Sequence, residues 1–409
     1  MKQYDLIVAG GGISGVAAAT AAAREGLSVL LIEKSGSLGG AMSNSLVYPF
    51  MSYTVRKNGE ARRISEGLFA EMRKRHEAYG DLSWETYKMV FDDMLSEAGA
   101  EILFHSCVFE VITEGRSVRS VRVATKAGVM TLSADFFIDT TGDGELFTLA
   151  GCDHQIGRES DGYCQPMTTC FRLAGVDVER FTREEDALQE KYMEYQKKKK
   201  ITNPRENILV FTGPGKGVLH FNTTRVIKHD PTDPFAISQA EILARRQIRE
   251  MLCFLRAESP ACANATLVSV ANHIGVRESR KLKGVHILTA EELKACIKFE
   301  DRIALGKYDI DIHNPTGTGT YIYTLPAGEY YSIPYRSLLP KEYDNLLVAG
   351  RCLSADHGAQ AAVRIMPICS CMGEAAGVAV AIAAKSGTDA HRVDIGAVQA
   401  RLLENGAVL

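Results

Sequence analysis

The chain has 409 residues and a formal net charge of −3, and 46% of its residues are hydrophobic. This length allows two domains with cores of their own, and the small charge gives no sign of a nucleic acid or an anionic membrane as partner. The ten cysteines include no C-x-x-C pair, which argues against a zinc site and a secreted disulfide framework, so no metal is expected.

The first 34 residues predict a strand, a glycine turn, a helix and a second strand. Residues 4–9 and 28–32 are apolar strands, and residues 13–25 form a helix of small residues that ends at Gly26. Residues 6–23 are uncharged, but their glycines are unfavourable for a membrane-spanning helix. Because Lys2 is the only early positive charge and no cleavage region follows, we expect no signal peptide and a cytoplasmic protein.

The turn between these elements carries a dinucleotide-binding fingerprint. Gly10, Gly12 and Gly15 form G-x-G-x-x-G, which provides a tight turn, a close approach to a pyrophosphate and close helix–strand packing. The helix N-terminus offers free N–H groups and about half a positive charge to the phosphates. Glu33 closes the second strand, where a carboxylate accepts both ribose hydroxyls and disfavours NADP. The plain alternative is a glycine turn in an ordinary α/β domain.

Later elements are predicted from apolar periodicity. A helix is expected over residues 86–99 and a strand over 100–105, and further buried strands over 135–139 and 344–349 each end in a glycine turn. A charged helix is expected over 184–200, strands near 207–212 and 217–226, and helices over 238–257 and 368–385. Residues 213–217 imitate a phosphate loop, but strand residues follow them, so a hairpin turn is the better interpretation.

Two histidines are candidates for proton transfer. Asp309, Asp311 and His313 alternate with apolar residues and are expected on one face of a strand, where a carboxylate can orient the imidazole. The same three residues are also compatible with a metal site or a solvated strand face. His357 lies on the loop between the last predicted strand and the terminal helix and is the second candidate.

Arginines gather in the same part of the chain, at positions 277, 280, 336 and 364. Guanidinium groups bind carboxylates by bidentate hydrogen bonds, so Arg280 and Arg364 are predicted to hold an anionic group of the substrate. The alternative is that these arginines pair with Glu278, Asp311 or the cofactor.

The sequence resembles FAD-dependent oxidoreductases related to the flavin subunit of heterodisulfide reductase and, more distantly, fumarate reductase flavoproteins. The resemblance covers nearly the whole chain and is carried by the fingerprint and by residues 38–41, 138–144, 221–226, 274–280, 308–315, 331–340 and 348–355. It implies an α/β fold with a Rossmann-like, three-layer ββα FAD-binding domain over residues 1–155. An α+β substrate domain (156–329) would be inserted before a return segment (330–409). No iron–sulfur motif is present, so the multi-centre electron-transfer version is excluded.

The resemblance also implies the cofactor contacts. They are Gly10, Gly12, Ser14, Gly15, Glu33, Lys34, Gly39, Gly40, Ala41, Val108, Thr141, Gly142, Asp143, Gly350, Arg351, Met366 and Gly373. Residues 40–44 contain no histidine, so FAD is expected to bind without a covalent bond. The N-terminus of the predicted helix at 368–385 would face the flavin and stabilise the charge of its reduced form by roughly 0.3–2 kcal/mol.

The predicted function is hydride transfer between flavin N5 and a small, carboxylate-bearing substrate, with His313 or His357 moving the proton and Arg280 and Arg364 binding the substrate. A second G-x-G-x-x-G is absent, so electrons would pass to a separate acceptor that visits the same flavin. Alternatives are a C=C reductase of the fumarate reductase type, an NAD-dependent dehydrogenase and a non-catalytic flavoprotein. The sequence leaves the oligomeric state open.

Overall fold

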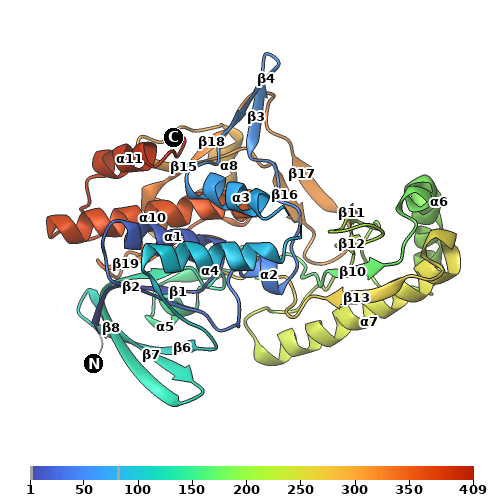
Figure 1. Cartoon of the computed structure of the whole chain (residues 1–409), viewed down its shortest axis with the longest axis horizontal. Helices are drawn as coiled ribbons and strands as arrows, with labels where there is room; N and C mark the ends of the chain where they lie inside the picture. The colour runs from blue at the N-terminus through green and yellow to red at the C-terminus, as the bar shows by residue number, and fades with distance from the viewer. Residues whose placement is uncertain (1–2, 81–82) are drawn as a thin grey trace.

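A mixed seven-stranded sheet forms the centre of the larger lobe in this computed structural model, which describes residues 3–80 and 83–409 (Figure 1). Its order is β5 (Glu101–Leu103), β2 (Val29–Ile32), β1 (Gln3–Ala9), β8 (Gly128–Asp139), β7 (Ser117–Thr125) and β6 (Cys107–Glu114), with β19 (Leu346–Val348) also on β8. β5, β2, β1, β8 and β19 run parallel, so their carboxyl ends share one edge. β1 and β2 are almost wholly buried, as parallel strands covered on both faces are.

Different layers cover the two faces of this sheet. One face packs against α1 (Ile13–Arg24), α3 (Leu68–Ala78), α4 (Thr86–Ala98) and α10 (Met366–Ser386). The other face packs against α5 (Glu145–Leu149) and against the antiparallel β6–β7 ribbon. This ribbon pairs with β8 and so continues the same sheet. These layers confirm the expected Rossmann-like ββα fold class.

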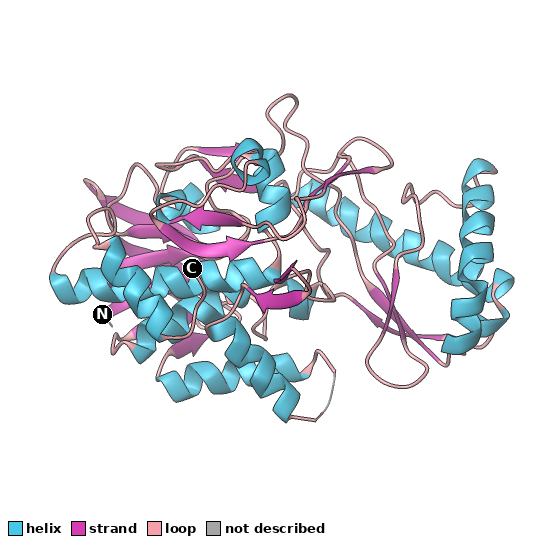
Figure 2. Cartoon of the chain, turned by 90° about the horizontal axis from the view of Figure 1, so that it is seen from above, coloured by secondary structure: helices cyan, strands magenta, loops and turns pink. Residues whose placement is uncertain are grey.

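A second lobe stands apart in Figures 1 and 2 and is built on a four-stranded antiparallel sheet. Its order is β11 (Val210–Thr212), β12 (Leu219–Phe221), β10 (Phe171–Ala174) and β13 (Thr266–Val270), with α6 (Val178–Lys197) and α7 (Pro234–Glu258) packed on one face. β11 and β12 form an antiparallel hairpin, which confirms the hairpin interpretation of residues 213–217. α6 begins earlier than predicted because the Asp177 side chain accepts the Arg180 N–H and caps it.

Short paired strands join the lobes and surround the edge of the main sheet. They are β9 (His154–Ile156) with β14 (Arg280–Leu282), β15 (Arg302–Gly306) with β18 (Tyr331–Pro334), β16 (Ile310–His313) with β17 (Thr320–Tyr323), and β3 (Thr54–Lys57) with β4 (Glu60–Arg63). The remaining short helices are α2 (Ala41–Asn44), α8 (Ala290–Lys294), α9 (His357–Val363) and α11 (Ile395–Glu404), and two 3-10 turns lie at Pro260–Cys262 and Tyr335–Leu338.

α10 is the central helix of the larger lobe. By length and composition alone it could cross a membrane, but 94% of its apolar window is buried inside the protein. It packs along α1 in one hydrophobic core, so a helix from the start of the chain contacts a helix from its last quarter. This environment is typical of a core helix.

Candidate functional site

A cavity of about 430 Å³ lies where the carboxyl ends of β1, β2, β8 and β19 meet the N-termini of α1 and α10. This edge of an open parallel sheet is where such folds bind ligands. The predicted cofactor contacts that line it are Gly10, Gly12, Ser14, Glu33, Lys34, Gly39, Gly40, Ala41, Thr141, Gly142, Asp143, Gly350, Arg351 and Met366. A smaller cavity of about 30 Å³ adjoins it and is lined by Val108 together with Glu33 and Thr141.

The N-terminus of α1 is suited to a phosphate. No described side chain caps this helix, and a Cβ at Gly12 would meet no heavy atom of the described residues within 4 Å. The Ser14 hydroxyl is buried and has no hydrogen-bond partner in the described part of the chain. Free N–H groups, an unpartnered hydroxyl and open space beside Gly12 together fit a pyrophosphate.

Gly15 and Gly373 are the two predicted contacts that line neither cavity. A Cβ at Gly15 would stand 1.9 Å from the Gly10 carbonyl oxygen, and one at Gly373 would stand 2.0 Å from the Ser14 carbonyl oxygen. Both glycines therefore hold α1 close to its neighbours, the turn after β1 and α10. They shape the site through packing.

Glu33 is held rigidly at the end of β2. One carboxylate oxygen accepts the Gly11 N–H at 2.7 Å and the other accepts the Ser35 N–H at 2.7 Å. The carboxylate lines both cavities, in the position from which it would accept ribose hydroxyls. Lys34 beside it forms an ion pair with Glu145 at 2.7 Å.

Asp143 joins the return segment to the glycine turn after β8. Its carboxylate pairs with Arg351 at 2.7 Å and accepts the Ser279 hydroxyl at 2.7 Å. Although burial raises the pKa of this carboxyl, the charges of Arg351 and Lys34 and the hydrogen bonds lower it below its ordinary value, so Asp143 is ionised. Arg280 does not line the cavity, but its guanidinium donates to the Asp143 carbonyl oxygen at 3.3 Å.

Arg364 does line the cavity and lies directly before the N-cap of α10. It reaches Asp311 at 3.8 Å, and its Nε has no partner in the described residues although that atom is buried. The first turn of α10 is also uncapped by any described side chain. A guanidinium and a helix N-terminus therefore meet at one end of the cavity, where they favour negative charge.

His313 is buried rather than solvated, which corrects the alternative of a solvated strand face. Its Nε2 lies 3.4 Å from Asp311, and its Nδ1 lies 3.1 Å from the Thr320 hydroxyl. Burial lowers its pKa to about 3, and the charge of Arg277 acts in the same direction. His313 is therefore neutral at pH 7, and it is not among the residues that line the cavity. No group of metal-ligating side chains that would hold an ion occurs in the part of the chain that the structure describes.

His357 begins α9 beside a buried ion pair. Its Nδ1 lies 2.8 Å from a Glu278 carboxylate oxygen that also accepts from Lys281 at 2.6 Å, and Glu278 and Lys281 are at most 1% exposed. Like His313, it does not line the cavity. The proton-transfer roles of both histidines stay predictions.

Several further lining residues were not predicted from the sequence. Among them are Asn44, Ser45, Glu241 and His273. His273 is the histidine of the described chain that does line the cavity; it is exposed, and its backbone N–H donates to the Asn44 carbonyl oxygen at 3.0 Å. Asn44 ends α2, the helix that follows the predicted glycine pair Gly39–Gly40. This closeness in sequence was the one signal that could have indicated Asn44 as a lining residue.

Comparisons with known proteins show the family to which the chain belongs. Residues 5–402 match the family model described as FAD dependent oxidoreductase. Digeranylgeranylglycerophospholipid reductase 1 of Methanococcoides burtonii is 25% identical over 193 residues, which are 44% of this chain and 46% of that protein. The match therefore spans less than half the length of that relative.

Two solved structures are similar at low identity. A geranylgeranyl bacteriochlorophyll reductase-like protein from Thermoplasma acidophilum is 15% identical, with a TM-score of 0.46 over 100% of this chain and 84% of that one. A flavin-dependent brominase is 13% identical, with a TM-score of 0.47 over 98% and 83% of the two chains. On the family match over residues 5–402, the chain belongs to the FAD-dependent oxidoreductases, and FAD is its cofactor.

Proposed function

We propose that this enzyme exchanges a hydride between a carbon of a small, anionic substrate and FAD. Bound FAD supplies the two-electron acceptor or donor. The observation that carries the proposal is the position of Arg364, whose guanidinium lines the cofactor cavity beside the uncapped N-terminus of α10. A cation at this point would hold an acidic substrate against the part of the cavity that belongs to the last quarter of the chain.

The chain itself would bind, orient and exchange a proton. Ser14 and the N–H groups of α1 would hold the pyrophosphate, Glu33 the ribose, and the return segment from Gly350 onward the redox end of the cofactor. In the oxidative direction, the substrate carbon gives up a hydride and its neighbouring O–H or N–H gives up a proton. We propose His313, His357 or the cavity-lining His273 as the group that takes this proton.

The substrate lobe is part of the same proposal. We assign residues 156–329 to an inserted substrate domain, between an FAD-binding segment at 1–155 and a return segment at 330–409. The sheet of the second lobe supports an insertion within these bounds, because its strands lie between Phe171 and Val270, pair with one another, and none joins the seven-stranded sheet among the described residues. The electron acceptor would be a separate molecule that reaches the same cofactor.

A second candidate is reduction of an activated C=C bond. The motif resemblance to fumarate reductase flavoproteins supports it, and the partly matching relative is named as a reductase. The two candidates share every residue above and differ in the direction of hydride transfer.

Anaerobic titration of the flavin-bound enzyme tests both candidates. Under the first, a member of a panel of hydroxy and amino acids bleaches the flavin absorption. Under the second, chemically reduced enzyme regains its colour when it is mixed with an unsaturated acid. An enzyme whose flavin responds to neither panel would overturn the proposal of an acidic substrate.

A further inference from the structure

One face of the four-stranded sheet in the second lobe is polar. Arg172 on β10 lies opposite His220 on β12, so their side chains share a face. Phe171 and Phe221 point to the other face, where their rings stack at 4.9 Å in the core under α6 and α7. The polar face is turned toward the N-terminal segment, because the His220 ring lies 5.7 Å from the ring of Tyr48.

Several buried polar atoms on and beside this face lack a hydrogen-bond partner in the described part of the chain. They are Thr169 Oγ1, Arg172 Nε, Arg205 Nη1, Asn222 Oδ1 and both ring nitrogens of His220. Arg172 and Arg205 are 7% and 5% exposed, and Thr169 and His220 are at most 1% exposed. A buried polar group without a partner destabilises the fold, so a cluster of such groups indicates a space that a polar molecule fills.

Two arginines beside this face have no carboxylate within 4 Å among the described residues. Arg205 donates from Nε to the Asn207 side chain at 3.0 Å, and Arg277 donates to the Pro166 carbonyl oxygen at 2.7 Å and the Thr168 hydroxyl at 2.6 Å. All these acceptors are neutral. A guanidinium that is withdrawn from water and left without a counter-charge is costly, so both positions call for an anion.

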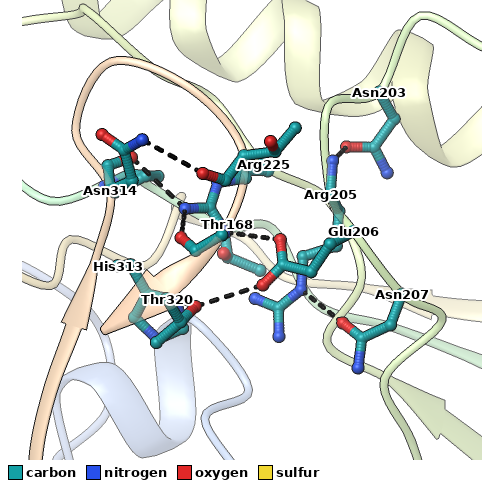
Figure 3. A network of polar contacts seen from close by, with 12 residues as sticks. Thr168, Asn203, Arg205, Glu206, Asn207, Arg225, His313, Asn314 and Thr320 are labelled. Carbon is teal, nitrogen blue, oxygen red and sulfur yellow. Dashed lines mark hydrogen bonds and ion pairs between the residues drawn. The ribbon is translucent and has the colours of Figure 1, made fainter. Parts of the chain in front are cut away.

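A neighbouring arginine, Arg225, does have a carboxylate partner. Arg225 pairs with Glu206 at 2.9 Å and also donates to the carbonyl oxygens of Asn314 and Gly319. Figure 3 shows this pair beside Arg205, whose guanidinium is joined by a dashed line to the side-chain oxygen of Asn207. The contrast sets Arg205 apart as an available cation.

Arg172, Arg205 and Arg277 lie around the start of β10. Arg277 donates to the hydroxyl of Thr168, two residues before Cys170, and Arg172 stands two residues after Cys170. Burial raises the pKa of Cys170 to about 12, and the charges of Arg277, Arg172 and Arg205 all oppose that rise. The pKa of Arg277 is itself lowered to about 9, first by burial and then by the charges of Arg364 and Arg205. Positive charge is therefore concentrated here, and it extends to Arg364 at the wall of the cofactor cavity.

Acidic groups offset part of this charge. Although burial raises the pKa of Glu206, the charges of Arg225 and Arg205 both lower it, so Arg205 shares that carboxylate's charge with the ion pair. The charge of Asp311 likewise opposes the lowering of the Arg277 pKa. Arg172 reaches Glu85 at 3.3 Å, and Arg364 reaches Asp311 at 3.8 Å. Asp311 is shared, because it also contacts His313 at 3.4 Å and accepts the Tyr308 hydroxyl at 2.8 Å. The cluster thus keeps a positive excess that a bound anion would neutralise.

We propose that Arg205, Arg277 and Arg364 form the carboxylate-binding part of the substrate site, between the polar face of the inserted sheet and the N-terminus of α10. The inference rests on the proposed function and narrows its substrate class to organic acids. Arg277 and Arg364 bind a carboxylate next to the cofactor, and Arg205 binds a second acidic group farther from it, so dicarboxylates bind more tightly than monocarboxylates.

The test uses FAD-loaded enzyme and two readouts, the melting temperature and the visible difference spectrum of the flavin. Acetate, succinate, phosphate and sulfate are titrated at constant ionic strength against potassium chloride. We expect succinate to raise the melting temperature saturably, to perturb the flavin spectrum and to bind at least about tenfold more tightly than acetate. Arg205→Gln is expected to abolish that preference, and Arg364→Gln to weaken both acids by about tenfold or more. The matched control is Arg62→Gln, an exposed arginine on β4, which should leave both affinities unchanged.

The wild-type titration keeps the proposal falsifiable if a variant does not fold. Equal, unsaturable responses to all four anions, or saturable responses to phosphate and sulfate alone, would overturn the carboxylate site. If the space holds only water, no anion should produce a response, and that result would also overturn the proposed carboxylate site. Failure of this inference differs from failure of the proposed function: in the first case an uncharged substrate still bleaches the flavin, and in the second no substrate of any charge changes its redox state.

Discussion

Gly373 on α10 lies directly against Ser14 on α1, and a Cβ at position 373 would stand 2.0 Å from the Ser14 carbonyl oxygen. This contact joins the last quarter of the chain to the helix whose N-terminus lines the cofactor cavity. The two helix N-termini that face the cavity are thus positioned by a backbone approach that only glycine permits.

Gly373→Ala should therefore destabilise the fold itself. The clash is with backbone, so side-chain rotation does not relieve it, and overpacking of this kind costs about 3 kcal/mol. Urea unfolding of flavin-free protein measures the loss. A variant with wild-type unfolding free energy would show that α1 and α10 are not packed as described.

Gly12→Ala should have the opposite signature. The backbone at Gly12 has φ −66°, which any residue adopts, and the new methyl group would enter open space in the flavin-free protein. Unfolding free energy should change by no more than about 1 kcal/mol. The affinity for FAD should fall by about tenfold or more, because the methyl group occupies the space expected for the pyrophosphate. Fluorescence titration with FAD measures this loss, and unchanged affinity would contradict the assignment.

Glu374 predicts a pH-dependent stability. It is 1% exposed on α10, and burial raises the pKa of its carboxyl to about 7, although the Leu68 N–H that it accepts opposes the rise. The folded state therefore holds a proton that the unfolded state has already lost above its ordinary pKa of about 4.3. This contribution is fully present below that pKa and is lost as pH rises through 7, by about 3 kcal/mol in all.

Glu374→Gln removes this titration while keeping the side-chain shape. Unfolding free energies of the two proteins, measured by urea between pH 4.5 and 8, should diverge as pH rises, with the variant gaining relative to wild type. Two parallel curves would show that Glu374 is not protonated in the fold.

His313 should remain neutral across the physiological range. Burial holds its pKa near 3, and the nearby Arg277 charge favours the neutral ring further. In protein labelled with carbon-13 histidine, its ring signal, assigned with His313→Gln, should not move between pH 5 and 8. In urea the same signal should titrate near the ordinary value of about 6.5. A midpoint near neutral pH in the folded enzyme would contradict the buried, neutral environment described for His313.

Much of the fold and of the lining of the cavity was predictable, because their signals are local. The fingerprint from Gly10 to Glu33 specifies the turn, the helix and the acidic residue within one short continuous stretch of sequence. β1, α1 and β2 lie where expected. The apolar run at 368–385 likewise predicted α10 to within two residues at its start and one at its end.

The substrate side was less predictable, because its residues meet only through pairing between distant segments. Arg172 and His220 share a face because β10 pairs with β12, and neither residue stands in a recognisable motif. His273 reaches the cavity from a loop outside any helix or strand. Asp311 and His313 alternate like a solvated strand, yet they are 9% and 8% exposed, since long-range packing decides their burial.

The absorption spectrum of the purified protein tests the central claim most directly. We expect the visible bands of oxidised flavin, and release of intact FAD into the supernatant when the protein is precipitated with acid. Flavin retained in the precipitate would contradict non-covalent binding alone. A colourless protein that takes up NAD and refuses added FAD would contradict the account as a whole.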